Sequence, residues 1–243
     1  MPLLIALQFL TRLPVRLPWL PSPEENGRSL LWYPAVGLIL GLLLTALHGL
    51  LGNLPSGLQA ALLLCAWVWL SGGLHLDGLA DTADAWVGGY GDRERTLTIM
   101  KDPTCGPMGV ITLVLVLLVK WAALAALLQA GHGYALLLTP WLARWSLPLV
   151  LLSMPYVRPG GLGQVLAEHA PRQTLPVLLL VHTLAMLLWG WPALLGLLLT
   201  AAVLLFVRRQ LLRRLGGTTG DTAGAIVELT EAVVLVGIAV LLI

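Results

Sequence analysis

Residues 108–128 read MGVITLVLVLLVKWAALAALL, an apolar run in which Lys120 is the only charged residue. Its length matches the roughly 20 residues that an α-helix needs to cross the hydrocarbon core of a bilayer. The whole chain agrees with this pattern, because 58% of its 243 residues are hydrophobic and only 11% are charged. A soluble domain carries about 25% charged residues. The sequence therefore predicts an all-α integral membrane protein.

Comparable apolar runs recur along the chain, separated by polar residues or by glycine and proline. They predict a single membrane domain, residues 1–243, with about seven transmembrane helices and a range of about six to eight. Residues 1–13 are expected to form a short helix at the membrane interface. The fifth and sixth spans are short, so they are expected to tilt or to enter the membrane only in part. The expected spans are residues 32–51, 58–70, 108–128, 134–154, 175–189, 193–207 and 222–243.

The basic residues indicate the orientation of these helices. Apart from Lys120 and Arg144, which lie inside spans, all of the 14 Lys and Arg residues precede the first span or lie in alternate loops. By the positive-inside rule, this distribution places the N-terminus in the cytoplasm and the C-terminus outside. None of the 12 acidic residues lies in an outer loop. We therefore expect an active site on the cytoplasmic side.

Residues 71–107, between the second and third spans, are expected to form a cytoplasmic acidic and phosphate-binding segment. Asp77, Asp81 and Asp84 are spaced four and three residues apart, so on a helix they share an arc of roughly 60°. Three carboxylates on one face repel each other unless a cation lies between them. Oxygen ligands of this kind suit Mg²⁺ or Mn²⁺. The alternative interpretation is a solvated acidic helix end.

The same segment contains candidates for binding phosphate. Lys101 and Asp102 precede Pro103, and Gly106 and Gly109 lead into the third span. Free backbone N–H groups beside a cation at the start of a helix are typical of phosphate sites. Four further residues have both a functional and a purely structural interpretation. His75 is either a base, a metal ligand or only a hydrogen-bonding residue. Arg93 and Arg95 either bind phosphate or are solvated, and Arg28 either binds phosphate or only anchors the topology.

A second acidic cluster opens the last span, where residues 220–231 read GDTAGAIVELTE. Asp221, Glu228 and Glu231 share an arc of roughly 80° at helical spacing. Carboxylates inside a membrane are costly unless they face a polar cavity or a partner. Two interpretations remain open. Either this face meets the first cluster across a water-filled pocket, or its glutamates form ion pairs with Lys120 or Arg144.

These segments resemble a known family. GGLHLDGLADTADA at residues 72–85, IMKD at 99–102 and GDTAGAIVELTE at 220–231 are similar to the cobalamin (5′-phosphate) synthases, also called adenosylcobinamide-GDP ribazoletransferases. The resemblance runs over the whole chain. It implies an enzyme of late cobalamin biosynthesis that joins α-ribazole, or its 5′-phosphate, to adenosylcobinamide-GDP and releases GMP. It also implies Mg²⁺ and a multi-pass protein of the bacterial cytoplasmic (inner) membrane.

The implied reaction is a phosphoryl transfer, which needs metal ions and a group that orients or deprotonates the attacking hydroxyl. On this basis we expect both substrates and the lipid bilayer as partners, and no nucleic acid. Association into homo-oligomers or with other cobalamin-synthesis enzymes stays open. The residue roles implied are Asp77, Asp81, Asp84 and His75 as catalytic groups, Asp77, Asp81, Asp84, Asp221 and Glu228 as metal ligands, and Lys101, Asp102, Arg93, Arg95, Gly106 and Arg28 as substrate contacts.

Two alternative functions share some of these sequence features. Membrane CDP-alcohol phosphotransferases also use spaced aspartates and Mg²⁺, but their D-x2-D-G-x2-A-R-x8-G-x3-D-x3-D spacing differs from the spacing here. An ion-coupled transporter would use the intramembrane Glu228 and Glu231 as coupling sites. The acidic residues lie toward one face of the membrane, which disfavours the transporter.

Overall fold

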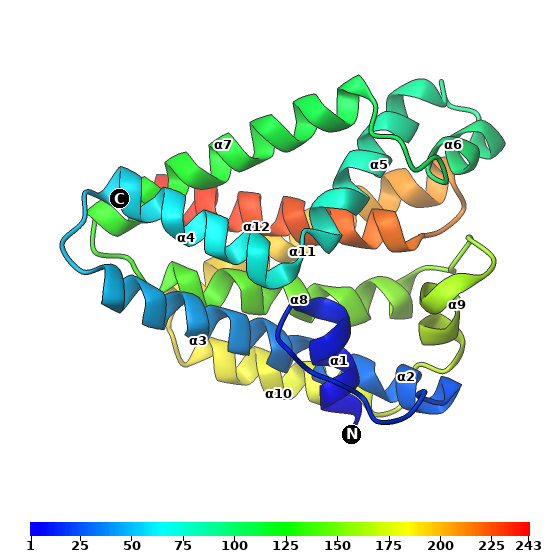
Figure 1. The fold of residues 1–243 in the computed structure, drawn as a ribbon, viewed down its shortest axis with the longest axis horizontal. Helices are drawn as coiled ribbons and strands as arrows, with labels where there is room; N and C mark the ends of the chain where they lie inside the picture. The colour runs from blue at the N-terminus through cyan, green and yellow to red at the C-terminus, as the bar shows by residue number, and fades with distance from the viewer.

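The computed structural model describes all 243 residues, Met1 to Ile243, and is helical throughout, with one isolated β-bridge between Tyr156 and Thr218. The long helices run side by side along the longest axis of the molecule (Figure 1). The elements are α1 (Pro2–Leu10), α2 (Pro23–Ser29), η1 (Leu30–Trp32), α3 (Tyr33–Leu51), α4 (Ser56–Ser71), α5 (Leu74–Gly88), α6 (Arg93–Ile99), α7 (Pro107–Gln129), α8 (Ala135–Ser153), α9 (Gly161–Glu168), α10 (Leu175–Leu187), α11 (Trp191–Arg214) and α12 (Gly220–Leu242).

Every predicted span is a helix in the structure, but not every one is long enough to cross a membrane. Five helices are long and apolar enough, namely α3 with the preceding α2 and η1, α7, α8, α11 and α12. The pair α4 and α5 would make a sixth span, although it is bent by 88°. Helix α10 has only 13 residues. By length and composition the structure therefore supports five spans, or six if α4 and α5 together cross once, and six is the lower end of the expected range of six to eight.

Helix α11 corrects a predicted boundary. The expected span ended at residue 207, whereas the helix has 24 residues and continues to Arg214. The prediction stopped where Arg208 and Arg209 end the apolar run. Because arginine is a good helix former, the helix continues past the apolar part into a charged tip.

Two glycines produce the bend between α4 and α5. Gly72 and Gly73 both have φ of +69°, in the left-handed region that favours glycine. The N–H of Gly72 donates to the carbonyl of Trp69, which ends α4. Helix α5 therefore does not follow the direction of α4, and it is not one of the five long spans. Its aspartates are carried across α12 instead of continuing along the axis of α4.

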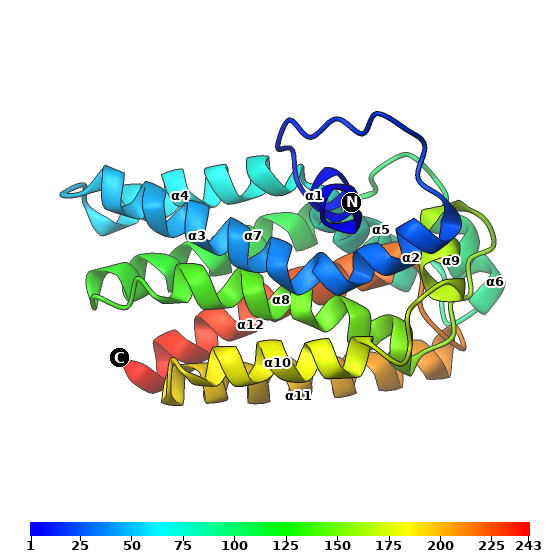
Figure 2. The same ribbon diagram turned by 90° about the horizontal axis from the view of Figure 1, so that it is seen from below.

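The two ends of the bundle differ in character. Helices α2, α6 and α9 and the arginine-rich tip of α11 gather at one end, while the C-terminus lies at the other (Figure 2). Helix α1 lies against the side of the bundle, where its Ala6 and Leu10 are buried beside Leu30 and Val36. The short N-terminal helix is thus present as predicted.

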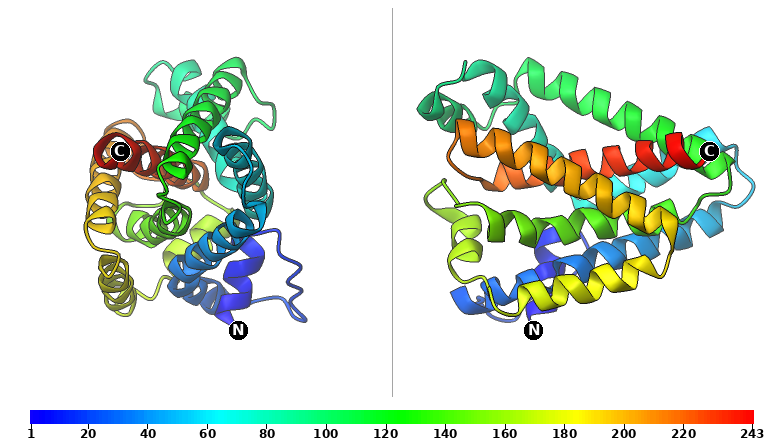
Figure 3. Two further views of the ribbon diagram at one scale, coloured as in Figure 1. Left: turned by 90° about the vertical axis from the view of Figure 1, so that its left-hand side faces the viewer. Right: turned by 180° about the vertical axis from the view of Figure 1, so that it is seen from behind.

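Helix α8 is the centre of the bundle, and the end-on view in Figure 3 shows it between α3, α11 and α12. Small residues of α3 allow the closest of these approaches. A Cβ at Gly41 would lie 2.6 Å from the carbonyl oxygen of Leu137 and 2.8 Å from its Cα. Neither backbone atom can move aside alone, so α3 and α8 would have to separate.

Gly41→Ala should therefore destabilise the protein by about 1–3 kcal/mol, the usual cost of overpacking a core. Gly49→Ala is the matched control, because a Cβ at Gly49 meets nothing within 4 Å. The measurement is thermal unfolding of the purified variants in detergent. Equal unfolding midpoints for the two variants would contradict the packing described here.

Candidate active site

The site begins where α5 crosses α12 at close range. A Cβ at Gly78 would lie 2.7 Å from the carbonyl oxygen of Asp221, and one at Gly224 would lie 3.2 Å from the Cα of His75. The glycines let the two backbones touch, which is the role expected of the small residues in both motifs. The crossing brings Asp221 of α12 beside Asp77 and Asp81 of α5.

Negative charge accumulates at this crossing. Burial, followed by the neighbouring carboxylates of Asp77 and Asp221, raises the pKa of Asp81 to about 6. Arg158, in the loop before α9, opposes this effect and donates from Nη1 to Asp221 Oδ2 at 2.6 Å. We call Asp77, Asp81 and Asp221 the carboxylate cluster. Arg158 alone does not balance the cluster, because three carboxylates share one guanidinium.

Asp84 has a different environment from the other aspartates of α5. Its Oδ2 accepts the N–H of Gly106 at 2.7 Å, and its Oδ1 accepts the N–H of Gly109 at 2.8 Å. Both oxygens therefore fasten the start of α7 to α5. Gly106 was expected to offer its N–H to phosphate, and in the structure this N–H donates to Asp84 instead.

A basic cavity of about 250 Å³ adjoins the carboxylate cluster. Arg93, Lys101 and Arg158 line it together with Glu94, which pairs with Arg93 at 2.7 Å. The structure therefore brings together two of the residues predicted to bind phosphate and adds Arg158 as a third. Arg93 is held by its Nε, which donates to the carbonyl of Leu215 at 2.8 Å. Because Arg158 also contacts Asp221, the cavity and the carboxylate cluster are connected through one side chain.

The other predicted phosphate contacts lie elsewhere. Asp102 accepts the hydroxyl and the N–H of Thr104, and these bonds lower the pKa of Asp102 within its exposed loop. Arg95 is exposed and stacks over the ring of Tyr90, 5.2 Å from its centroid. Arg28 is exposed in the last turn of α2. None of these three residues lines the basic cavity.

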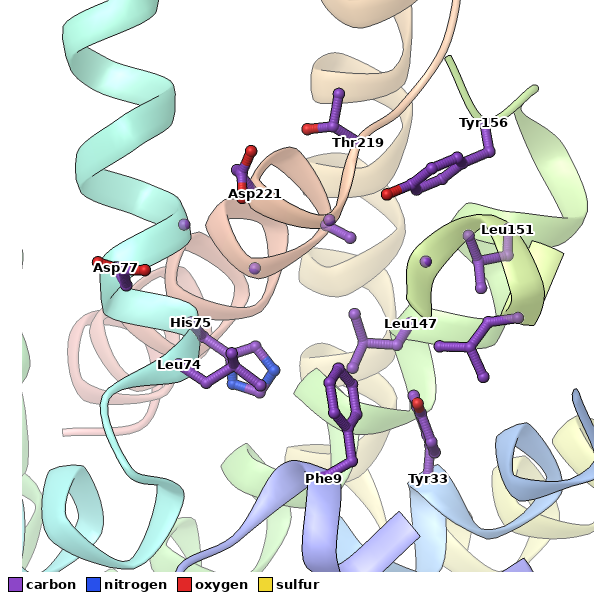
Figure 4. A pocket seen from close by; sticks show the side chains of 16 residues that line it. Phe9, Tyr33, Leu74, His75, Asp77, Leu147, Leu151, Tyr156, Thr219 and Asp221 are labelled. Atoms are coloured by element: carbon purple, nitrogen blue, oxygen red, sulfur yellow. The ribbon is translucent and has the colours of Figure 1, made fainter. Parts of the chain in front are cut away.

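A second cavity, of about 170 Å³, lies beside Asp77 and Asp221 of the carboxylate cluster (Figure 4). Asp77 and Asp221 line it together with His75, and the remaining wall is largely apolar. His75 is only 4% exposed. Its Nδ1 lies 3.4 Å from Nη2 of Arg144. Since a guanidinium has no acceptor, Nδ1 accepts this hydrogen bond and the ring hydrogen is on Nε2.

The glutamates of α12 form a buried ionic network and do not face a metal site. Lys120 of α7 donates to Glu228 at 2.9 Å and also pairs with Glu231, which in turn pairs with Arg144 of α8. The Nε1 of Trp67 donates to Glu231 at 3.2 Å. The ion-pair interpretation is thus the one that the structure shows. Glu228 was expected to be a metal ligand, and in the structure its carboxylate accepts a hydrogen bond from Lys120.

The comparison with known proteins covers nearly the whole chain. Residues 2–239 match the model of the family described as cobalamin-5-phosphate synthase. The chain belongs to this family. The adenosylcobinamide-GDP ribazoletransferase of Ectopseudomonas mendocina (strain ymp) is 64% identical over 235 residues, 97% of each chain. That of Pseudomonas paraeruginosa is 61% identical over 237 residues, 98% of this chain and 97% of the relative. No solved structure matches.

The family that the motifs indicated is therefore confirmed. The metal site stays a prediction. No group of three or more His, Cys, Asp or Glu residues converges closely enough to hold a metal ion. Mg²⁺ nevertheless fits the residues present, because it is usually held by one or two carboxylates together with waters and substrate phosphates. The carboxylate cluster offers such oxygens beside the basic cavity.

No signal in the sequence marks Arg158 as a site residue. Arg158 lies 63 residues before Asp221 in the chain and belongs to none of the family motifs. Only the fold identifies its partner.

The buried network should respond differently to one substitution and to two. Lys120→Met leaves Glu228 and Glu231 facing each other with one cation, and breaking a buried pair in this way costs about 3–5 kcal/mol. Lys120→Met combined with Glu228→Leu retains the Arg144–Glu231 pair and should be the more stable of the two variants. Thermal unfolding in detergent tests this order, and a double variant that is less stable than the single one would contradict it.

Proposed function

We propose that the chain transfers α-ribazole, or its 5′-phosphate, onto adenosylcobinamide-GDP and releases GMP, with the reaction at the carboxylate cluster. Two relatives that carry this activity in their names are 64% and 61% identical to the chain over almost its full length. The observation that carries the proposal is the Arg158–Asp221 pair, which joins acidic residues to the basic cavity.

The geometry suits a phosphoryl transfer. The hydroxyl oxygen of the ribazole forms a bond to the phosphorus attached to cobinamide, and the bond from that phosphorus to the GMP oxygen breaks. Arg93, Lys101 and Arg158 hold the negative phosphates in the basic cavity. A carboxylate of the cluster accepts the proton of the attacking hydroxyl, as general-base catalysis requires. GMP leaves with the electrons of the broken bond.

One or two carboxylates of the cluster, drawn from Asp77, Asp81 and Asp221, would hold Mg²⁺ or Mn²⁺ together with waters and the substrate phosphates. When the metal is bound, it neutralises part of the negative charge of the diphosphate. Asp84 contributes less directly, because its two oxygens accept backbone N–H groups of Gly106 and Gly109. Its role in the proposed site is to hold the loop of Lys101 against α5.

We also propose that the site faces the cytoplasm of a bacterium and that the protein is a multi-pass protein of the inner membrane. The helical end that carries α6, α9 and the basic tip of α11 is the end that the positive-inside rule assigns to the cytoplasm. The N-terminus then lies in the cytoplasm and the C-terminus outside.

Asp81→Asn should abolish turnover while the protein remains folded, because the substitution removes charge from the centre of the cluster. Glu168→Gln is the control, since Glu168 is exposed on α9, and it should retain full activity. The assay supplies adenosylcobinamide-GDP and α-ribazole phosphate to protein in liposomes and follows GMP and the cobalamin product. Full activity of the Asp81 variant would refute the assignment.

The same assay tests the function as a whole. Wild-type turnover should require Mg²⁺ and should stop when EDTA is added in excess. A folded wild-type protein without product from either form of ribazole would contradict the proposal and favour CDP-alcohol chemistry. The transporter alternative has lost its structural support, because the coupling sites that it needs, Glu228 and Glu231, are buried in ion pairs.

A further inference from the structure

We propose that the cavity of about 170 Å³ beside the carboxylate cluster binds the planar aromatic base of the ribazole substrate. We call it the base pocket and define it by Phe9, Tyr33, His75, Leu147, Leu151 and Leu166. This inference rests on the proposed function and deepens it, because it assigns one of the two substrates to one cavity.

The walls of the base pocket suit a flat apolar ring. Leu147 and Leu151 come from α8 and Leu166 from α9, so three leucines of two helices form one side. Phe9 of α1 and Tyr33 of α3 form the other, with ring centroids 6.2 Å apart and ring planes inclined by 27°. Aromatic walls of this kind favour an aromatic ligand over an aliphatic one.

The hydroxyl of Tyr33 shows that the pocket is built for a polar atom as well. Tyr33 is only 3% exposed, and its hydroxyl makes no hydrogen bond of ordinary geometry in the protein, where the Ser29 side chain is a polar neighbour. Figure 4 shows this oxygen directed among the side chains that line the cavity. A buried hydroxyl without a partner is costly, so its presence here points to a ligand that supplies one.

His75 adds a second donor. Because Arg144 donates to Nδ1, the imidazole is neutral and its hydrogen is on Nε2. Arg144 is itself fixed by its ion pair with Glu231, so the buried network determines which ring nitrogen of His75 can donate. The sequence left His75 open as a base or metal ligand, and this contact makes it a donor that lines the cavity.

The base of a ribazole matches these two donors. It is an imidazole fused to a benzene ring, in which one nitrogen carries the ribose and the other has a free lone pair. Such a base has one acceptor and no donor, and its remaining surface is apolar. The Tyr33 hydroxyl and the His75 Nε2–H can each serve that one acceptor, while the leucines and Phe9 cover the rings.

The position of the pocket also orders the two substrates. Asp77 and Asp221 line the same cavity, so a base held there directs its ribose toward the carboxylate cluster. A corrin macrocycle is several times larger than a bicyclic base and does not fit. In this arrangement the diphosphate of the other substrate lies in the basic cavity, across the Arg158–Asp221 pair from the base pocket.

The first test compares Tyr33→Phe with Tyr134→Phe, a matched variant at the opposite end of the bundle. Loss of one hydrogen bond to the base should raise the KM for α-ribazole about threefold to tenfold. The KM for adenosylcobinamide-GDP and kcat should stay at the wild-type values, and Tyr134→Phe should change nothing. An unchanged KM for α-ribazole in Tyr33→Phe, or an equal change for both substrates, would overturn the assignment.

The second test measures binding without turnover. Equilibrium dialysis of α-ribazole alone against the full-length protein in detergent gives its Kd, and Leu147→Trp, which fills the pocket, should weaken binding at least tenfold. If Leu147→Trp does not fold, Tyr33→Phe in the same dialysis decides the question. If the folded variants bind α-ribazole with the wild-type Kd, the assignment of the base pocket is overturned, even if their turnover is normal. Absent turnover with Tyr33-dependent binding would instead overturn the proposed function and support the pocket.

Discussion

The crossing of α5 and α12 at Gly78 is the contact on which the site depends. Only hydrogen side chains at Gly78 and Gly224 allow the backbones to approach closely enough for the aspartates of two separate motifs to meet. Asp221 is 140 or more residues from Asp77 and Asp81 in the chain, so the helices and not local sequence bring the carboxylates together. The bend at Gly72 and Gly73 is what gives α5 the direction that this crossing requires.

The site has an acidic centre next to two cavities of different character. Arg93, Lys101 and Arg158 line one cavity together with Glu94, and the other is largely apolar and contains Tyr33 and His75. Such an arrangement suits two substrates that a phosphodiester joins, since the charged part of one and the aromatic part of the other need opposite environments. Arg158 lines the basic cavity and Asp221 lines the apolar one, so their ion pair connects the two cavities.

The sequence predicted the helices and the acidic face of α5 well, because hydrophobic runs and helical spacing report these features directly. It could not predict partners. Helical spacing put Asp84 on the same face as Asp77 and Asp81, but its oxygens turn to the N–H groups of Gly106 and Gly109. Spacing likewise put Glu228 on the face of Asp221, yet Lys120 of another helix takes it. Periodicity identifies a face of a helix and leaves open what lies opposite.

The buried network has a consequence for how such a chain can change over evolutionary time. Lys120 and Arg144 balance Glu228 and Glu231, so the group as a whole carries no formal charge inside the membrane. A single change that removes one member leaves a net charge where no water can reach it. Genetic drift at these positions therefore has to proceed by compensated pairs, and a relative that has lost the lysine is expected to have lost one of the glutamates with it.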